Sequence, residues 1–358
     1  MARYASELLG GLLTVRPQND YQLLAHRPLD EFHIPARGRL SRQWESPNFP
    51  VRLAWMQLLL PPWLPGAGFD VCHFTNYLAP LLSRVPTVVT FHDMSIYLEA
   101  DGHPKKRVLV HRALMPIVAR RAAAIITDTE SARRDVIARL KVDPGRVHAV
   151  LLGTSPRFRV IEGGDALQDV ARRLSLPPEF ALFVGTLEPR KNLTRVVEAM
   201  HRLRTGGVTV PLLLAGGTGW KNESLMARIE ELDMADSVRF LGHVAEEDLP
   251  ALINLATVFV FPSLYEGFGL PILEAMACGV PVVTSRGGAT GEVAGDAALT
   301  VAATDTAEIA DGVGSVLADA SLRQRLRDAG LRRAAGFSWE TAARETAEIY
   351  DRVAAPNG

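Results

Sequence analysis

The sequence predicts an α/β protein built from two doubly wound domains. Short apolar runs rich in Val, Ile and Leu recur along the chain, and longer charge-bearing segments with helical spacing separate them. Continuous apolar runs are typical of parallel strands that are covered on both faces. The 358 residues exceed one compact domain and suit two domains of about 150–200 residues each.

The predicted elements alternate between helix and strand. The chain begins with an amphipathic helix over residues 2–13. In the first half we expect strands near 21–25, 70–74, 86–91, 123–127 and 147–151. In the second half we expect strands near 181–185, 210–215, 238–241, 257–261, 280–284 and 298–301. The stretch 155–178 is rich in Pro and Gly and is the predicted linker between a domain of residues 1–160 and a domain of residues 175–337.

The first domain is expected to be unusual at its start. In a doubly wound domain the first strand normally lies near the centre of the sheet. Because this chain opens on a helix, we expect either that the central strand is missing or that the native start lies upstream, at roughly one strand and one loop, about 15–25 residues.

Composition excludes several classes of protein. Apolar residues make up 47% and charged residues 22% of the chain, which excludes disordered and collagen-like proteins. The two cysteines, Cys72 and Cys278, are too few for a disulfide framework and fit a reducing compartment, so we expect a cytoplasmic protein. Prolines break the long uncharged stretch of residues 53–69, which is therefore not a membrane span.

Charge is distributed unevenly along the chain. Residues 1–160 carry 21 Lys/Arg and 13 Asp/Glu, a balance of +8, whereas residues 161–358 carry 18 and 27, a balance of −9. A basic first half either reflects ordinary scatter or favours an anionic partner or surface. The basic residues are spread out and not interleaved with aromatics, which argues against nucleic acid as a partner.

One segment of the second half predicts a phosphate site. Residues 262–281 read PSLYEGFGLPILEAMACGVP and follow the predicted strand 257–261. Gly267 and Gly269 allow a tight turn, Pro271 suits the start of a helix, and Gly279 suits its end. A two-turn helix over 271–278 would expose its N-terminal amides at the carboxyl end of the sheet, where they attract anions.

Charged side chains surround this predicted site. Glu266 lies in the loop, and Glu274 lies on the helix, where its carboxylate suits the two hydroxyls of a ribose. Alternatively Glu274 only favours the helix dipole and Glu266 is solvated. Arg190 and Lys191, in GTLEPRKN just beyond the strand 181–185, are the expected counter-charge for a phosphate; otherwise they form a solvated turn.

A histidine marks the corresponding edge of the first domain. His92 follows the predicted strand 86–91, so we expect it to face the ligand crevice and to donate a hydrogen bond or act in acid/base chemistry. The alternative is a packed loop histidine. No GxxxxGK[ST], GxSxG or Asp-x-Asp string occurs, and no His or Cys pair has metal-ligand spacing, so we expect no metal and no cofactor.

These strings resemble a known family. EGFGLPILE, with two glutamates eight residues apart, is similar to the retaining glycosyltransferases of family 4, which have the GT-B fold. The resemblance extends over nearly the whole chain through TFHDMS, TDTESARRDV, LLGTSPRF, GTLEPRKNL, LAGGTGW, FLGHVAEEDLPALI, GGATGEVAGDAALTV and FSWETAARETAEIY. It implies two Rossmann-like domains that face a central crevice, with a C-terminal helix, residues 338–354, that crosses back to the first domain.

The resemblance also implies an activity and its residues. It implies transfer of a sugar, with retained configuration, from a nucleotide diphosphate sugar to a glycan or lipid-linked acceptor in polysaccharide or glycoconjugate biosynthesis. GTLEPRKN and the FHD context look most like mannosyltransferases that use GDP-mannose. The resemblance implies that Arg190 and Lys191 bind the diphosphate and that Glu274 binds the ribose. It implies that Glu266 and His92 contact the sugar and that the base lies near His243 and Val244. It also implies that the sugar and phosphate are approached by the backbone amides of Gly267, Phe268, Gly269 and Leu270.

Two departures from the family pattern keep other readings open. Thr186 stands where many members carry an arginine, and the family's first strand and glycine-rich loop are missing. A non-catalytic nucleotide-sugar-binding or regulatory protein is therefore the main alternative, and epimerisation or phosphorolysis of a sugar is another. If the acceptor is lipid-linked, the basic first domain could also contact an anionic membrane at the inner face of the cell membrane.

Overall fold

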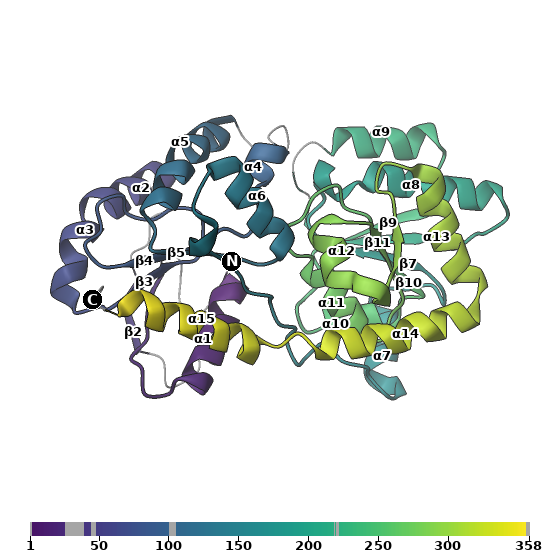
Figure 1. Ribbon diagram of the computed structural model, residues 1–358. Helices are drawn as coiled ribbons and strands as arrows, with labels where there is room; N and C mark the ends of the chain where they lie inside the picture. The colour runs from purple at the N-terminus through teal and green to yellow at the C-terminus, as the bar shows by residue number, and fades with distance from the viewer. Residues whose placement is uncertain are drawn as a thin grey trace. The chain divides into compact units, whose positions relative to one another are not determined.

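The computed structural model describes residues 2–25, 39–43, 48–99, 105–217, 219 and 222–355. The chain divides into two compact units, coloured purple to teal and teal to yellow-green for the most part in Figure 1. Unit 1 comprises Met1–Gly153 and Ser338–Gly358, and unit 2 comprises Thr154–Phe337. Each unit contains parallel strands flanked by helices, which confirms the predicted fold class.

Unit 1 begins and ends with a helix, α1 and α15. Its described helices are α1 (Ala2–Val15), α2 (Phe49–Leu58), α3 (Leu60–Trp63), α4 (Ser95–Leu98), α5 (Lys105–Arg121), α6 (Glu130–Leu140) and α15 (Trp339–Ala354). Its strands are β1 (Gln22–Ala25), β2 (Arg39–Gln43), β3 (Cys72–Phe74), β4 (Thr87–Thr90), β5 (Ala124–Thr127) and β6 (Val147–Ala149). Five of these strands match predicted ones, whereas the analysis of apolar runs missed β2, which contains two arginines and no long apolar run.

The described strands of unit 1 form two sheets. β1 pairs only with β2, and the other sheet has the order β3-β4-β5-β6 with every pair parallel. Residues of β4 and β5 are all buried, as expected for apolar runs covered on both faces, whereas β3 at the sheet edge is only half-buried. Among the described residues, no strand joins β1 to β3.

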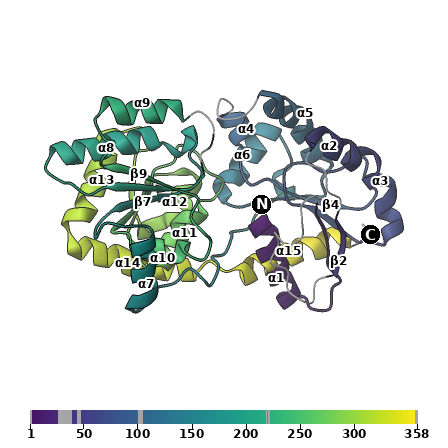
Figure 2. The ribbon, with the colours of Figure 1, turned by 180° about the vertical axis from the view of Figure 1, so that it is seen from behind.

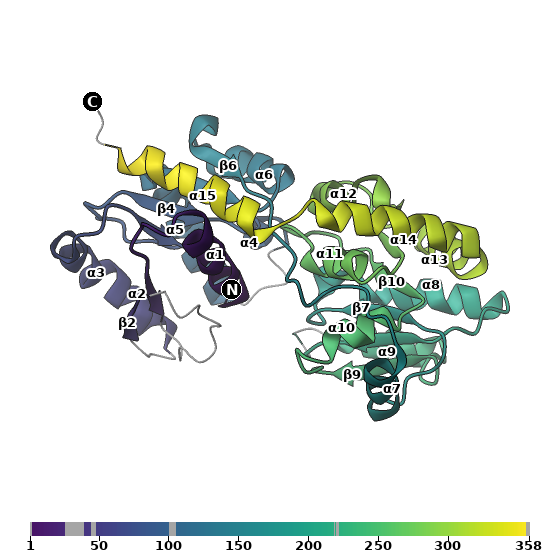
Figure 3. The same cartoon turned by 90° about the horizontal axis from the view of Figure 1, so that it is seen from below.

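Helices α1 and α15 lie side by side in unit 1 (Figure 3). A Cβ atom at Gly11 would lie 2.7 Å from both the Ala343 side chain and the Trp339 carbonyl, so a glycine is needed for this close approach. Ala5, Leu8, Leu9 and Leu12 of α1 are buried, which confirms that the predicted helix is amphipathic.

The uncharged stretch 53–69 folds against unit 1. It forms most of α2, all of α3 and a 3-10 turn over Leu64–Ala67. Leu60 and Leu64 pack with Val85, and Trp55 and Trp63 pack against that cluster. Among the described residues, no helix combines the length and the apolar character needed to cross a membrane.

A partly buried chain of polar side chains connects β3 and β4 to helices α1 and α15. The Tyr350 hydroxyl of α15 lies 2.6 Å from Nδ1 of His73, and Nε2 of His73 lies 2.7 Å from the Thr90 hydroxyl. The Thr90 hydroxyl in turn lies 3.1 Å from the Tyr4 hydroxyl of α1. Because Tyr350 can donate to Nδ1 while Nε2–H donates to Thr90, a neutral His73 satisfies the chain.

Acidification is expected to destabilise unit 1 through His73. Burial, with a smaller contribution from the charge of His92, lowers the pKa of His73 to about 3 from an ordinary value of 6.5. The unfolded chain therefore binds a proton that the folded chain excludes as the pH falls from 6.5 toward 3, and stability decreases over that window by up to about 1.4 kcal/mol per pH unit. Urea unfolding across this window should show a shallower decrease for His73→Gln, and an unchanged slope would contradict the assignment.

Unit 2 contains the second set of helices and strands. Its helices are α7 (Gly164–Arg173), α8 (Leu193–Thr205), α9 (Glu223–Glu231), α10 (Leu249–Asn254), α11 (Leu270–Ala277), α12 (Gly288–Ala294), α13 (Thr306–Ala318) and α14 (Ala320–Ala335). Its strands are β7 (Ala181–Val184), β8 (Leu212–Ala215), β9 (Val238–Gly242), β10 (Val258–Phe261), β11 (Val282–Ser285) and β12 (Leu299–Val301), each within two residues of a predicted strand. The stretch predicted as a linker contains α7 and belongs largely to unit 2.

The sheet of unit 2 is a single parallel sheet with the order β12-β11-β10-β7-β8-β9. Helices α8, α9 and α13 pack together on one face, and α10, α11 and α14 pack on the other (Figure 2). The order places β7 and β10 side by side at the centre, where the chain reverses its direction of winding. In doubly wound sheets ligands bind at the carboxyl ends of the strands at this switch point.

Candidate functional site

The residues predicted to bind a phosphate lie at the switch point of unit 2. The loop after β7 contains Arg190 and Lys191, and the loop after the neighbouring strand β10 contains Glu266. Because β7 and β10 are parallel, both loops leave the same edge of the sheet. The structure therefore brings together two parts of the predicted site that are separated by 75 residues.

The loop after β7 is held in place by Asn192. This residue follows a 3-10 turn over Pro189–Lys191 and has φ of 63°, a conformation that asparagine tolerates better than most residues. Its side-chain amide donates to the carbonyls of Pro262, after β10, and Ala303, after β12. These bonds join the loop that contains Arg190 and Lys191 to the neighbouring loops of the sheet.

Glycines allow a second loop to support this one. Gly216 directly follows β8 and has φ of 144°, and a Cβ atom there would lie 2.1 Å from the carbonyl oxygen of Gly185, which directly follows β7. A Cβ atom at Gly219 would lie 2.3 Å from the carbonyl oxygen of Leu187. The amide of Leu187 donates to the carbonyl of Gly217. The two loops therefore approach backbone to backbone, directly before Glu188 and Arg190.

Glu266 pairs with both predicted phosphate-binding cations. Arg190 Nη1 lies 2.6 Å from Oε2 of Glu266, and Lys191 Nζ lies 2.5 Å from Oε1. Arg190 Nε also donates to Oε2 of Glu188 at 2.9 Å. The Lys191 ammonium further lies 4.8 Å from the centre of the Phe261 ring, within range of a cation–π contact.

This cluster of Glu188, Arg190, Lys191 and Glu266, called the switch-point cluster below, is largely buried. The side chains of Lys191 and Glu266 are each 9% exposed. Burial alone raises the pKa of Glu266, but the charges of Lys191 and Arg190 outweigh it and hold this pKa below its usual range. Burial lowers the pKa of Lys191, and Glu266 opposes that shift. The cluster thus contains two cations and two carboxylates in balance.

Helix α11 carries the second predicted glutamate. It spans Leu270–Ala277, one residue earlier at each end than predicted, and begins after Gly269, which has φ of 107°. Glu274 is 2% exposed, so this carboxylate lies inside unit 2. Burial raises the pKa of the Cys278 thiol, and the charge of Glu274 raises it further, which indicates that this carboxylate lies close to Cys278 inside unit 2.

The remaining predicted donor residues lie on the same edge of the sheet. Gly267, Phe268 and Gly269 are buried, and the Phe268 ring packs edge-on against Phe337, so this ring belongs to the core. His243 is exposed and Val244 is buried, directly after β9. The strand before them, β9, lies two strands from β7, which is about 10 Å along the sheet.

His92 forms a separate buried pair in unit 1. Its Nδ1 lies 2.7 Å from Oδ2 of Asp128, and its Nε2 donates to the carbonyl of Thr75 at 3.0 Å. Burial by itself lowers the pKa of His92, but the charge and hydrogen bond of Asp128 outweigh burial and raise it. Edge-on contacts with Tyr4 and Tyr77 enclose the ring. Both ring nitrogens are therefore engaged within unit 1.

Sequence analysis missed two partners of the predicted residues. Asp128 follows β5, which is parallel to and adjacent to β4, the strand before His92. Polar residues after adjacent parallel strands lie at the same sheet edge, so the position of Asp128 directly after the predicted strand 123–127 was a signal for this pairing. Glu188 was part of GTLEPRKN, but its role as a partner of Arg190 depends on how the loop folds.

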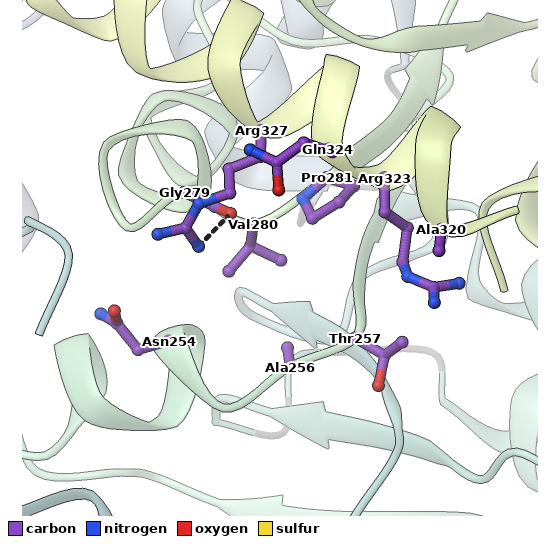
Figure 4. A pocket seen from close by; sticks show the side chains of 10 residues that line it. All are labelled: Asn254, Ala256, Thr257, Gly279, Val280, Pro281, Ala320, Arg323, Gln324 and Arg327. Carbon is purple, nitrogen blue, oxygen red and sulfur yellow. Dashed lines mark hydrogen bonds between the residues drawn. The ribbon is translucent and has the colours of Figure 1, made fainter. Parts of the chain in front are cut away.

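A cavity of unit 2 lies at the opposite edge of the sheet. It has a volume of about 280 Å³ and is lined by residues just before β10 and β11 and by α14, as Figure 4 shows. Both arginines of its wall are hydrogen-bonded to backbone carbonyls: Arg323 donates to the carbonyls of Val316 and Leu317, and Arg327 donates to that of Gly279.

Within the described ranges, no three His, Cys, Asp or Glu side chains gather as a metal site.

Comparison with known proteins agrees with this architecture. Residues 12–153 match the family described as glycosyl transferase 4-like domain, and residues 168–333 match glycosyl transferases group 1. The chain is 36% identical over 282 residues to the O-antigen chain mannosyltransferase B of Escherichia coli, covering 78% of this chain and 74% of that protein. It is 32% identical over 308 residues to the MMP α-(1→4)-mannosyltransferase of Mycolicibacterium hassiacum, covering 80% and 71%.

Solved structures show the same fold at lower sequence identity. Sucrose-phosphate synthase from Thermosynechococcus elongatus superposes with a TM-score of 0.76 at 21% identity over 98% of this chain and 92% of that one. The HepE protein of Anabaena in complex with UDP and glucose gives 0.76 at 18% identity over 97% and 95%. The matching family models and the similar relatives show that this chain, with its switch-point cluster, belongs to the family-4 glycosyltransferases of the GT-B fold.

Proposed function

We propose that this protein is a retaining mannosyltransferase that moves mannose from GDP-mannose to a glycan or lipid-linked acceptor in polysaccharide or glycoconjugate biosynthesis. The observation that carries the proposal is the placement of Arg190 and Lys191, largely buried cations, at the carboxyl edge of the sheet where β7 meets β10. The choice of mannose rests on the two mannosyltransferase relatives, each at least 32% identical to this chain.

In the proposed reaction the bond between the anomeric carbon and the diphosphate oxygen breaks, and a bond to an acceptor hydroxyl forms on the same face. The hydroxyl proton passes to the leaving diphosphate oxygen. Arg190 and Lys191 stabilise the negative charge that develops on the leaving group, and Glu274 accepts hydrogen bonds from the ribose hydroxyls. The side chains therefore contribute orientation and electrostatic stabilisation, with no covalent intermediate on the protein.

Nucleotide binding tests the proposed donor. Thermal unfolding should be followed in EDTA with GDP, UDP, ADP and dTDP, on wild type, Glu274→Gln and the exposed control Glu230→Gln. A nucleotide at 100 times its dissociation constant should add about 2.7 kcal/mol of stability. We expect GDP to stabilise wild type and the control, and Glu274→Gln to lose most of the effect. Stabilisation by UDP alone would overturn the choice of donor, and full retention in Glu274→Gln would overturn the ribose assignment.

Transfer itself tests the reaction class. GDP-mannose should be incubated with mannose-terminated oligosaccharides and lipid-linked oligosaccharides, and the anomeric centre of any product should be examined by NMR. We expect the configuration of the donor in the product. An inverted product would contradict retention, and donor binding with no product from any acceptor would favour the non-catalytic alternative.

Several expectations from the sequence stay predictions. These are the contact of His92 with the donor sugar, the position of the base near His243 and Val244, independence from metal ions and cofactors, the cytoplasmic location, and contact of the basic first domain with an anionic membrane.

A further inference from the structure

We propose that Glu266 is an internal competitor of the diphosphate, and that it makes the site hold the nucleotide sugar better than the sugar-free nucleoside diphosphate. The inference rests on the proposed function, because it concerns the same site. The site would thereby discriminate between the donor substrate, which is the nucleotide sugar, and the product nucleoside diphosphate, which contains the same nucleotide.

The structure shows Glu266 where an anionic ligand of Arg190 and Lys191 would be. Its two carboxylate oxygens are divided between the two cations, at 2.6 Å from Arg190 Nη1 and 2.5 Å from Lys191 Nζ. A carboxylate that bridges two cations in this way offers the same charge and acceptor geometry as two oxygens of a phosphate. A diphosphate that binds both cations must therefore displace Glu266.

The charge balance of the switch-point cluster supports this displacement. Glu188 and Glu266 together match the charges of Arg190 and Lys191, so the four side chains of the cluster carry no net charge. An incoming diphosphate would also meet the negative charge of Glu266 at close range. Once Glu266 has turned away, both cations can bind the ligand and the repulsion is relieved.

The displaced carboxylate then needs new donors. The Glu266 side chain is 9% exposed, and a buried carboxylate without hydrogen-bond donors is costly. The sugar of an intact donor carries hydroxyls that can donate to Glu266, whereas a nucleoside diphosphate has none at that position. Glu266 therefore exchanges partners when the nucleotide sugar binds, and returns to Arg190 and Lys191 when only the diphosphate remains.

Glu188 offers a matched control for this exchange. It also neutralises Arg190, with Oε2 at 2.9 Å from Nε, and it lies two residues before Arg190 in the chain. Loss of its charge should strengthen the binding of any diphosphate, with or without a sugar. A change in the ratio of the two affinities should therefore be specific to Glu266.

Calorimetric titration of the full-length protein with GDP and with GDP-mannose tests the proposal, and UDP with UDP-glucose serves as a parallel pair. We expect Glu266→Gln to bind the sugar-free diphosphate at least tenfold more tightly than wild type. Its preference for the nucleotide sugar over the diphosphate should fall at least tenfold. Glu188→Gln should change both affinities in the same direction and leave their ratio within about threefold, or about 0.7 kcal/mol.

The possible outcomes distinguish a failure of the proposed exchange from a failure of the proposed donor site. If Arg190→Gln weakens the diphosphate while Glu266→Gln leaves the affinity ratio unchanged, the donor site stands and the exchange is wrong. If neither nucleotide pair binds wild type, or if Arg190→Gln binds as well as wild type, the proposed donor site is wrong and the exchange with it. Glu266→Ala, checked for folding by circular dichroism, provides a second variant if the glutamine variant does not fold.

Discussion

Replacing Lys191 by methionine is expected to lower the free energy of unfolding by about 3 kcal/mol, because it leaves Glu266 buried with one cation fewer. Removing one partner of a buried ion pair typically costs 3–5 kcal/mol, and Arg190 remains as a partner here, which favours the lower value. Methionine preserves the apolar stem against the Phe261 ring. Urea unfolding of the full-length protein, followed by tryptophan fluorescence, measures the change.

A double-mutant cycle with Glu266→Gln identifies the cause. If the charge of Glu266 is responsible, Lys191→Met should cost markedly less in the Glu266→Gln background than in wild type. Arg202→Met, on the exposed face of α8, provides the control and should change stability by less than about 0.5 kcal/mol. A cost below about 1 kcal/mol for Lys191→Met would show that the buried pair contributes little to the fold.

The second large effect is expected at Gly216, where alanine should destabilise unit 2 by about 3 kcal/mol or more. The backbone there has φ of 144°, which side-chain-bearing residues rarely adopt, and the new Cβ would lie 2.1 Å from the Gly185 carbonyl oxygen. The ends of β7 and β8 would have to separate. The melting temperature of a domain of this size should fall by about 6–12 °C in calorimetry.

The adjacent Gly217 is the matched control for this substitution. A Cβ atom built there meets no other atom within 4 Å, and its φ lies outside the left-handed range. Gly217→Ala should therefore leave the melting temperature within about 2 °C of wild type. If the two alanine variants are equally stable, the close approach of the β7 and β8 loops does not constrain the fold.

The sequence was informative wherever structure depends on neighbouring residues. Apolar runs identified β4, β5, β7 and β10, because a strand buried on both faces needs apolar side chains at successive positions. Pro271 and Gly269 located the start of α11 within one residue. β2 escaped because it lacks this pattern, and α7 escaped because its flanking prolines and glycines suggested a linker.

Contacts between residues far apart in the chain were harder to predict than helices and strands. Arg190, Lys191 and Glu266 were each predicted as site residues, yet their direct pairing was not, since it requires β7 to lie beside β10 while β8 and β9 lie beyond β7. The contact of His92 with a ligand stays a prediction, and the structure adds that both of its ring nitrogens have partners within unit 1. Asp128 follows the next predicted strand along the chain, but its pairing with His92 also requires β4 to lie beside β5.

By itself the sequence determined the α/β class, the positions of most strands and the motifs at their carboxyl ends, because these depend on side chains a few residues apart. Only the tertiary structure decided which strands are neighbours, which loops approach through Gly216, and which charges share a buried site. Those choices depend on how the whole sheet packs, and no local pattern encodes them. The contact of Glu266 with the two cations belongs to this second group: the sheet order brings it about, across 75 residues of chain.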